Sequence, residues 1–349
     1  MKKNIKDLSY DEVLAFFTEN GEKKFRAGQL FSWLYVKNAV SFEEMTDFSK
    51  ELRALMEARF SVSSLNIEEK LVSQKDGSVK YLFRTHDDNY IESVLLKSAS
   101  ESGDRVTVCV SSQIGCAMGC TFCRTSRLGI IRNLSAGEIL EQISLIRRDS
   151  GEKNTNVVFM GMGEPFNNYD EVIRAAKTIN LDAGFNISVR RITISTCGIL
   201  PAIERYLDEG HLFKLALSLN DTLHEKRLKN MPVENKYPVA DVADLLRRKF
   251  PHGRNRLTLE YVMRDDNISK DDAVRIKKLF KNIPVKLNLI PLNPGADVSN
   301  IPSEKEINEF VDNLGIMNIP IIIRKSLGQD INGACGQLSG RKYKGAADV

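Results

Sequence analysis

Hydrophobic and polar positions divide the chain into two parts with different patterns. In the first part, apolar residues recur at the spacing of amphipathic helices after residues 9–12 and 41–44, which both have the sequence of a capping box. Residues 79–84 and 90–96 then alternate as strands do, with turn residues between them. This pattern predicts a small, mostly helical N-terminal part that ends in two linking strands.

The pattern changes after the polar residues 98–104 to strand candidates that alternate with helical segments. The strand candidates are residues 106–111, 157–160, 192–195, 213–218, 257–262 and 285–290. Residues 139–148, which follow a capping box at Ser135, and residues 239–250 are typical of the helices between them. Such alternation indicates βα units and a parallel sheet, so we expect the α/β class. Six units over about 220 residues favour a partial, TIM-like (β/α)6 barrel over a complete one.

We therefore place two domains in the 349 residues, an accessory domain over residues 1–95 and a core over residues 96–349. A hydrophobic content of 42% and a charged content of 28% are ordinary for a soluble globular protein. The sequence has no apolar run of 18 residues or more, the length needed to cross a bilayer, and its start has no apolar signal region. We therefore expect no membrane partner. Residues 1–95 hold 14 basic and 16 acidic residues, which leaves the core with the net positive charge. That charge is compatible with a polyanion such as RNA.

Three cysteines stand close together in Cys116-Ala-Met-Gly-Cys120-Thr-Phe-Cys123. A [4Fe–4S] cluster that is held by four cysteines has no free iron position and serves only as an electron carrier. A cluster held by three cysteines keeps one iron open, where a small molecule can bind and be reduced. A structural zinc site is disfavoured, because the chain has no second Cys or Cys/His pair. Buried cysteines without a metal are the plain alternative, yet free cysteines rarely cluster so tightly. A cluster together with free thiols predicts a reducing compartment, the cytoplasm.

Small and polar residues follow several of the predicted strands. They are Gly161-Met-Gly-Glu164-Pro165 after the second strand, Ser195 after the third, Ser218-Leu219-Asn220 after the fourth and Asn293 after the sixth. Each alone could form a turn or cap a helix. In parallel βα folds, however, ligands bind at the carboxyl ends of the strands. Their convergence on one barrel mouth therefore favours a small polar ligand.

These motifs together resemble the radical S-adenosylmethionine (SAM) enzymes, and their flanks are similar to the RNA adenine C2-methyltransferases of the RlmN type. The matching stretches cover nearly the whole chain: Phe25-Arg-Ala-Gly-Gln29, Trp33-Leu-Tyr35, Phe42-Glu-Glu-Met-Thr-Asp47, Cys109-Val-Ser-Ser-Gln-Ile-Gly-Cys116, Arg132-Asn-Leu134, Leu289-Ile-Pro-Leu-Asn-Pro294 and Ala334-Cys-Gly-Gln-Leu338. The resemblance implies a radical SAM barrel with an RNA-binding accessory domain. It implies an enzyme, a SAM-dependent RNA (adenine-C2)-methyltransferase that forms 2-methyladenosine in 23S rRNA and in tRNA.

The resemblance also implies cofactors, partners and residue roles. Cys116, Cys120 and Cys123 would hold a [4Fe–4S] cluster with SAM on the open iron, and two SAM molecules would be used per turnover. An electron donor such as flavodoxin and a monomeric state are expected. Cys335 matches the cysteine that carries a methyl group, and Cys109 the cysteine that resolves the product through a transient disulfide bond. Glu92 matches the carboxylate that accepts the C2 proton. The SAM-contacting positions match Gly163, Glu164, Ser195, Ser218, Leu219, Asn220 and Asn293.

Departures from the family pattern keep alternatives open. Asn220 stands where the family usually has His, and Phe166 replaces the usual Leu. Pro165 favours C2 chemistry, because the related C8-methylating enzymes of the Cfr type, which confer antibiotic resistance, have Ala there. A C8-methylating enzyme, another radical SAM enzyme and a non-enzymatic iron–sulfur RNA-binding protein are the alternatives. Three arginines near the cysteines are candidate phosphate contacts: Arg124, Arg127 and Arg132.

Overall fold

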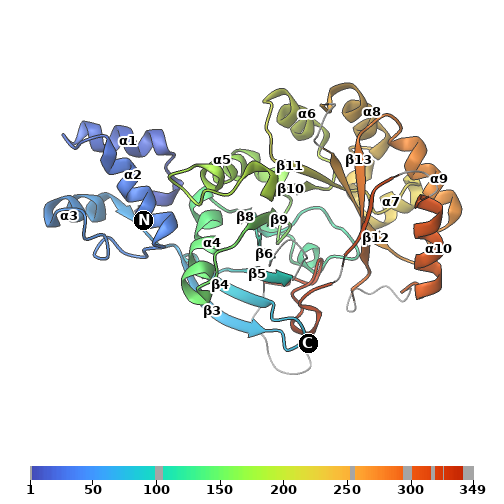
Figure 1. Ribbon diagram of the computed structural model, residues 1–349, viewed down its shortest axis with the longest axis horizontal. Coiled ribbons are helices and arrows are strands. Elements are labelled where there is room, and N and C mark those ends of the chain that lie inside the picture. The colour runs from blue at the N-terminus through green and yellow to red at the C-terminus, as the bar shows by residue number, and fades with distance from the viewer. Residues whose placement is uncertain are drawn as a thin grey trace.

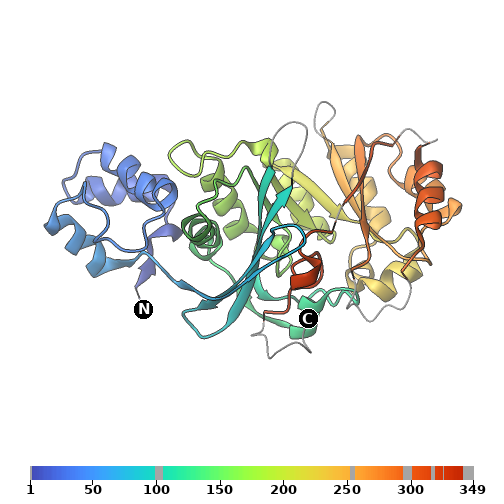
Figure 2. The same cartoon turned by 60° about the horizontal axis from the view of Figure 1, so that its bottom comes forward.

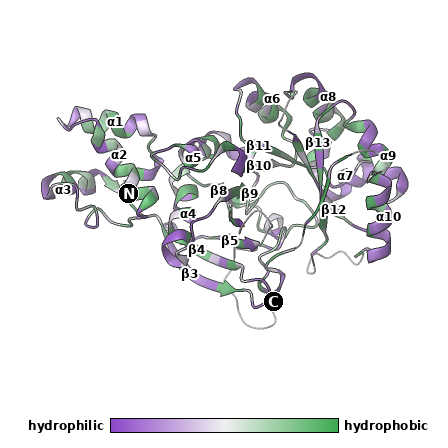
Figure 3. Ribbon diagram, viewed as in Figure 1, coloured by the Kyte–Doolittle hydropathy of each residue, from purple (hydrophilic) through white to green (hydrophobic). Residues whose placement is uncertain are grey.

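The computed structural model describes residues 2–98, 105–251, 256–293, 301–315, 319–324 and 326–340. Figure 1 shows a group of N-terminal helices beside a larger unit in which helices surround a sheet. The N-terminal elements are β1 (Lys3–Asn4), η1 (Ile5–Asp7), α1 (Tyr10–Glu19), α2 (Phe25–Phe31), the π-helical turn η2 (Ser32–Val36), α3 (Lys50–Arg59) and β2 (Phe60–Ser61). Apolar side chains of these helices belong to the buried core. Figure 3 shows hydrophobic and hydrophilic stretches alternating along the same helices.

One of the two predicted helix starts in this region is confirmed. Helix α1 begins after Ser9, whose hydroxyl accepts the Glu12 N–H while the Glu12 carboxylate accepts the Ser9 N–H. The prediction of a helix directly after residues 41–44 is wrong, because residues 41–49 form turns and bends and α3 begins only at Lys50. The hydroxyl of Ser49 caps that helix by accepting the Leu52 N–H. The apolar spacing that indicated a helix instead buries side chains of successive turns.

A ten-stranded sheet forms the centre of the larger unit, in the order β14-β13-β12-β11-β10-β9-β6-β5-β4-β3. Its parallel strands are β6 (Arg105–Val110), β9 (Asn156–Phe159), β10 (Ile192–Thr196), β11 (Lys214–Ser218), β12 (Leu257–Met263), β13 (Val285–Pro291) and β14 (Ile321–Ile323). The six predicted core strands correspond to β6 and β9–β13. They are largely buried, as expected for parallel strands that helices cover on one face and a filled interior covers on the other.

Helices connect these parallel strands and lie outside the curved sheet (Figures 1 and 2). They are α4 (Ala136–Ser150), α5 (Tyr169–Asn180), α6 (Leu200–Asp208), α7 (His224–Asn230), α8 (Val239–Lys249), α9 (Lys270–Leu279) and α10 (Glu304–Gly315), with the short helices η4 (Pro165–Asn168), η5 (Val189–Arg191) and η6 (Pro232–Asn235). Two further short helices lie elsewhere: η3 (Arg124–Leu128) precedes β8, and η7 (Gln329–Ile331) follows β14. The sheet runs from β14 to β3 without closing, which confirms the partial barrel. No described helix is both long enough and apolar enough to pass through a bilayer.

Three antiparallel strands extend the sheet on the side of β6: β3 (Leu65–Val72), β4 (Val79–Thr85) and β5 (Tyr90–Ser98). The two predicted linking strands correspond to β4 and β5, whereas β3 was not predicted. Because these strands hydrogen-bond into the sheet of the core, they join the two predicted domains. The boundary near residue 95 stays a prediction.

A buried carboxylate of the barrel binds the N-terminal part at several points. Glu141 of α4 accepts hydrogen bonds from the Ser64 N–H at 2.9 Å, from the Ser64 hydroxyl at 2.9 Å and from the Asn4 side chain at 3.2 Å. Its other oxygen accepts from the Leu65 N–H and from the Ser63 hydroxyl. Buried carboxylates are stable when hydrogen-bonded in this way, so the contact fixes the segment that joins the helices to β3.

Candidate active site

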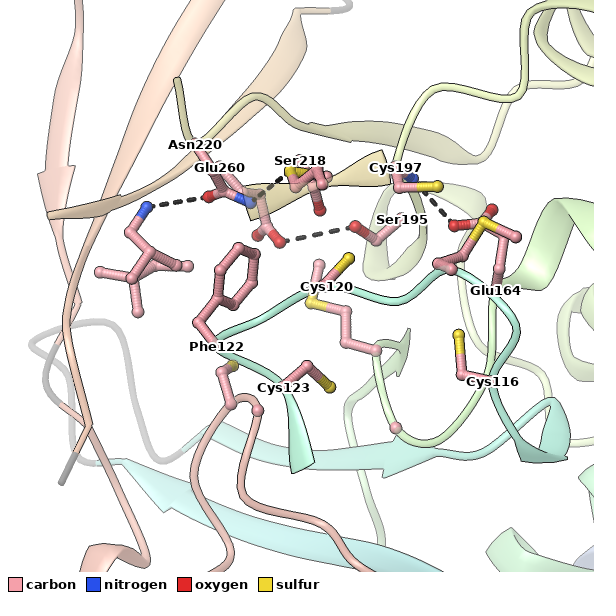
Figure 4. A pocket seen from close by; sticks show the side chains of 18 of the residues that line it. Cys116, Cys120, Phe122, Cys123, Glu164, Ser195, Cys197, Ser218, Asn220 and Glu260 are labelled. Carbon is pink, nitrogen blue, oxygen red and sulfur yellow. Dashed lines mark hydrogen bonds between the residues drawn. The ribbon is translucent and has the colours of Figure 1, made fainter. Parts of the chain in front are cut away.

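A pocket opens at the carboxyl ends of the parallel strands. Most of the predicted site residues line it: Cys116, Cys120, Cys123, Gly163, Glu164, Ser195, Ser218, Asn220, Asn293 and Cys335. Figure 4 labels seven of them, which converge from the loop of the three clustered cysteines, from the turn after β9 and from the ends of β10 and β11: Cys116, Cys120, Cys123, Glu164, Ser195, Ser218 and Asn220. The structure does not bring Leu219, Cys109 or Glu92 into the lining of the pocket.

The three clustered cysteines lie on the loop between β7 (Gln113–Gly115) and η3, here named the cysteine loop. Strand β7 forms an antiparallel pair with β8 (Ile130–Asn133). Backbone contacts fix this loop: the Cys116 N–H donates to Gly129 O at 2.7 Å, and the Ser126 hydroxyl contacts the carbonyls of Cys120 and Cys123 at 2.7 Å. Burial raises the pKa of the Cys116 thiol to about 12. Free thiols here would therefore be protonated, and iron would have to displace a proton from each to bind a thiolate.

The donor set fits a [4Fe–4S] cluster better than a single ion. Among the described residues, no group of three or more His, Cys, Asp and Glu side chains could hold one metal ion. In a cluster each thiolate binds a different iron, so the three sulfurs need not converge on one point. Three thiols on one loop, all facing one pocket, suit that arrangement (Figure 4).

The turn after β9 brings backbone close to the cysteine loop. Gly163 has a φ of +100°, and a Cβ built on it would lie 2.6 Å from Cβ of Gln113, so only glycine fits. The Gln113 side chain accepts the Glu164 N–H at 2.8 Å. Oε2 of Glu164 accepts the Cys197 N–H at 2.8 Å, which joins the turn to the loop after β10, while burial raises the pKa of its carboxyl.

The amide of Asn220 is occupied by protein contacts at the end of β11. Asn220 adopts a left-handed φ of 56°, a conformation that Asn tolerates better than most residues. Its Oδ1 accepts the Val262 N–H at 3.0 Å, and its Nδ2 contacts the Met231 sulfur at 3.3 Å. The residue that departs from the family pattern thus connects β11 to β12 while it lines the pocket.

Two buried charged residues of the site were missed by sequence reasoning. Arg227 of α7 donates to the carbonyls of Leu219 at 3.0 Å and Cys197 at 2.7 Å, and it pairs with Glu234 at 2.5 Å. It therefore joins the loops that follow β10 and β11. Glu260 of β12 lines the pocket, 3.5 Å from the Ser195 hydroxyl. A carboxylate inside the apolar run of β12 was the available signal for Glu260, whereas nothing in the sequence around Arg227 indicates its contacts.

Cys335 lies on residues 326–340, here named the Cys335 segment, and is exposed toward the pocket. Cys109 is buried in β6. Burial, and then the charge of Cys335, raise the pKa of the Cys109 thiol to about 12, so the two thiols lie within electrostatic reach of each other. All six cysteines belong to the described residues and are free, so the predicted disulfide bond is not formed in this structure. Cys197, which follows β10, is buried.

Glu92 of β5 is buried and lies outside the lining of the pocket. Its Oε1 pairs with Lys80 at 3.0 Å, and its Oε2 accepts the N–H groups of Ser339 at 2.5 Å and Gly340 at 2.9 Å. The carboxylate is therefore close to the Cys335 segment rather than in open contact with the cavity.

Arg132 of β8, a candidate phosphate contact, is engaged within the protein. Its guanidinium pairs with Asp87 at 2.7 Å and with Glu138 at 2.8 Å. Two carboxylates offset its charge, which makes it a poor candidate for binding a phosphate. The pairing also holds the pKa of the Asp87 carboxyl well below its usual range.

Comparisons with known proteins agree with this geometry. Residues 3–62 match the family model described as "Ribosomal RNA large subunit methyltransferase N-terminal domain", and residues 110–275 match "Radical SAM superfamily". The chain is 44% identical to the dual-specificity RNA methyltransferase RlmN of Geobacter sulfurreducens, over 97% of this chain and 92% of that protein. It is 41% identical to the probable dual-specificity RNA methyltransferase RlmN of Thermotoga neapolitana, over 96% of this chain and 97% of that protein. The crystal structure of a radical SAM methyltransferase from Sphaerobacter thermophilus superposes with a TM-score of 0.90 at 37% identity, covering 97% of this chain and all of that one. Because it has three cysteines in one pocket and is similar to these relatives over nearly its full length, this chain belongs to the RlmN family of radical SAM RNA methyltransferases.

Proposed function

We propose that this enzyme forms 2-methyladenosine in 23S rRNA and in tRNA, through a methyl group carried on Cys335. The observation that carries the proposal is the presence of Cys335 in the same pocket as Cys116, Cys120 and Cys123. The names of the relatives support two classes of RNA substrate, because both are called dual-specificity RNA methyltransferases. A single pocket then has to admit a methyl donor and an adenine.

In this proposal Cys116, Cys120 and Cys123 hold the [4Fe–4S] cluster. When bound, the cluster and SAM would supply the radical chemistry that activates a methyl group, and the cluster would take back one electron once the new carbon–carbon bond has formed. The turn at Gly163 and Glu164 offers backbone to the ligand at close approach, because Gly163 has no side chain. Polar side chains at the neighbouring strand ends would orient SAM: Ser195, Ser218, Asn220 and Asn293, with the backbone of Leu219 behind them.

The residues of the chain account for the remaining steps. The Cys335 sulfur accepts a methyl group from one SAM molecule, and the carbon that it carries later bonds to adenine C2, so two SAM molecules are used per turnover. Glu92 takes the proton from C2. The thiolate of Cys109 then attacks the Cys335 sulfur and breaks its bond to the methylene carbon. That carbon leaves with the bonding electron pair and takes up a proton to become the methyl group of the base, while the two sulfurs form a transient disulfide bond. The electrostatic coupling of the two thiols supports this pairing.

Carbon C2 is favoured over C8 by the relatives, which are named for RlmN, and by Pro165 in the turn. The RNA substrates make the cytoplasm the expected compartment. We also propose that the enzyme acts as a monomer and that a small electron-transfer protein such as flavodoxin reduces it.

Nucleoside analysis of RNA tests this function directly. Ribosomal and transfer RNA from cells with and without the protein would be digested and separated by mass spectrometry. We expect 2-methyladenosine to disappear from both RNA classes without the protein, and to return with the wild-type chain but not with Cys335→Ala. Loss of 8-methyladenosine would instead identify the C8 enzyme. RNA that is unchanged in both classes would overturn the proposal.

A further inference from the structure

The Cys335 segment is bound to the antiparallel strands rather than to the barrel alone. Near its start, the Gly328 N–H donates to Oδ2 of Asp76 at 2.8 Å, and Asp330 accepts the Ser73 hydroxyl at 2.8 Å. Figures 1 and 2 both show this red segment beside the strands β4 and β5. The position of Cys335 therefore depends on residues that lie far from it in the sequence.

One buried ion pair contacts the segment on both sides of Cys335. Lys80 of β4 donates to the Asn332 carbonyl at 3.3 Å, three residues before Cys335. Glu92, its partner on β5, accepts the N–H groups of Ser339 and Gly340. The side chains of Lys80 and Glu92 are only 2% and 0% exposed.

Burial of both charges constrains what this pair can do. A buried ion pair is tolerated only when hydrogen bonds satisfy the remaining donors and acceptors. Here the ammonium lies 3.0 Å from Oε1 of Glu92 as an ion pair, and two backbone amides of the Cys335 segment donate hydrogen bonds to Oε2. An ion pair that served stability alone would not need both partners to reach the backbone of the same segment.

We propose that Lys80 is a positioning residue for methyl transfer. Its ammonium holds the carboxylate of Glu92 in the orientation that binds Ser339 and Gly340, and its contact with Asn332 fixes the other side of the loop. Cys335 is thereby kept at the mouth of the pocket. The inference rests on the proposed function, because it assigns the methyl-carrying role to Cys335.

The experiment compares Lys80→Met and Lys80→Arg with the wild-type chain. Lys97→Met is the matched control, because Lys97 of β5 forms a solvent-exposed pair with Glu152. Hydrogen exchange is followed by mass spectrometry on the peptide that contains Ser339 and Gly340, and RNA methylation is followed with the reconstituted iron–sulfur enzyme. In Lys80→Met, we expect that peptide to lose its protection and methylation to fall about tenfold or more. Lys80→Arg, which keeps the charge, should restore most of both, and Lys97→Met should change neither.

The location of the exchange separates positioning from general destabilisation. A purely structural role would increase exchange in peptides throughout the sheet, whereas positioning confines the increase to the Cys335 segment. Wild-type protection and wild-type rate in Lys80→Met would overturn the proposal. If Lys80→Met is insoluble, the double variant Lys80→Met/Glu92→Gln leaves no unpaired buried charge and is expected to show the same local loss of protection; unchanged protection there contradicts the proposal. If the wild-type chain itself fails to methylate RNA, the proposed function fails, while the exchange data still decide whether Lys80 holds the segment.

Discussion

The side chain of Asn293, at the end of β13, donates a hydrogen bond to the backbone carbonyl of Cys335 at 3.1 Å. Its own Oδ1 accepts from Gln329, in η7, at 2.8 Å. One amide thus connects the last long strand of the barrel to the segment that carries the exposed thiol. Asn293 has a structural contact here in addition to its predicted contact with SAM.

Replacement of Asn293 by alanine should therefore impair the reaction without unfolding the protein. We expect methyl transfer to RNA to slow by about tenfold, because Cys335 loses a contact that sets its place. Gln329→Ala removes only the supporting hydrogen bond and should have a smaller effect. Steady-state kinetics of the wild type, Gln329→Ala and Asn293→Ala measure whether the rate falls in that order. Equal rates in Asn293→Ala and the wild type would contradict the prediction.

Arg227→Met should strongly destabilise the protein. The change leaves Glu234 buried without its partner and removes donors from the carbonyls of Leu219 and Cys197, which costs about 3–5 kcal/mol. Arg205→Met is the control, because Arg205 forms its ion pairs with Asp170 and Glu209 at the surface, where such pairs contribute little to stability. Denaturant unfolding measures both changes, and similar values for the two variants would show that the buried pair has no special importance.

Gly163→Ala should disrupt the turn that faces the cysteine loop. The new Cβ would approach the Gln113 backbone nitrogen to 2.8 Å, at a φ that disfavours any side chain. We expect a loss of about 1–3 kcal/mol in the free energy of unfolding, together with weaker SAM binding by calorimetry. Gly315→Ala at the exposed end of α10 meets no atom within 4 Å and should bind SAM normally. Normal binding by Gly163→Ala would remove this turn from the SAM site.

Alkylation should distinguish the two proposed catalytic thiols. A raised pKa keeps a thiol protonated, so with a pKa of about 12 the reactive thiolate of Cys109 is a fraction on the order of one in ten thousand at pH 8. The pKa of the Cys335 thiol is raised too, so exposure decides the order: iodoacetamide should modify the exposed Cys335 before the buried Cys109. Labelling of Cys109 should rise roughly tenfold per pH unit from pH 8 to 10, as measured by peptide mass spectrometry. In denatured protein the two rates should be similar; similar rates in the folded protein would contradict the burial of Cys109.

The sequence predicted those parts of the fold that depend on local pattern. Continuous apolar runs identified β6 and β9–β13, whereas β14 has only three residues and β3 is largely polar, with a bulge between Ile67 and Glu69. The capping-box pattern was correct at Ser9 and wrong at residues 41–44, where tertiary packing favours turns over a helix.

The strand-end rule found most of the pocket, because every parallel strand ends at the same edge. It could not find contacts between distant segments. Arg227 acts on carbonyls of two loops, and Lys80 reaches Glu92 and Asn332 across the sheet, and no local pattern encodes either arrangement.

The attachment of the N-terminal helices through Glu141 has a consequence for how a large substrate is measured. Its hydrogen-bond donors belong to β1 and to residues 63–65 at the start of β3, and the carboxylate itself belongs to α4 of the barrel. These contacts thus hold the N-terminal helices at a fixed distance from the mouth of the barrel. Under the proposed function, an RNA that contacts both parts would have to present its adenine at that spacing, so the shape of the RNA would contribute to the choice of substrate.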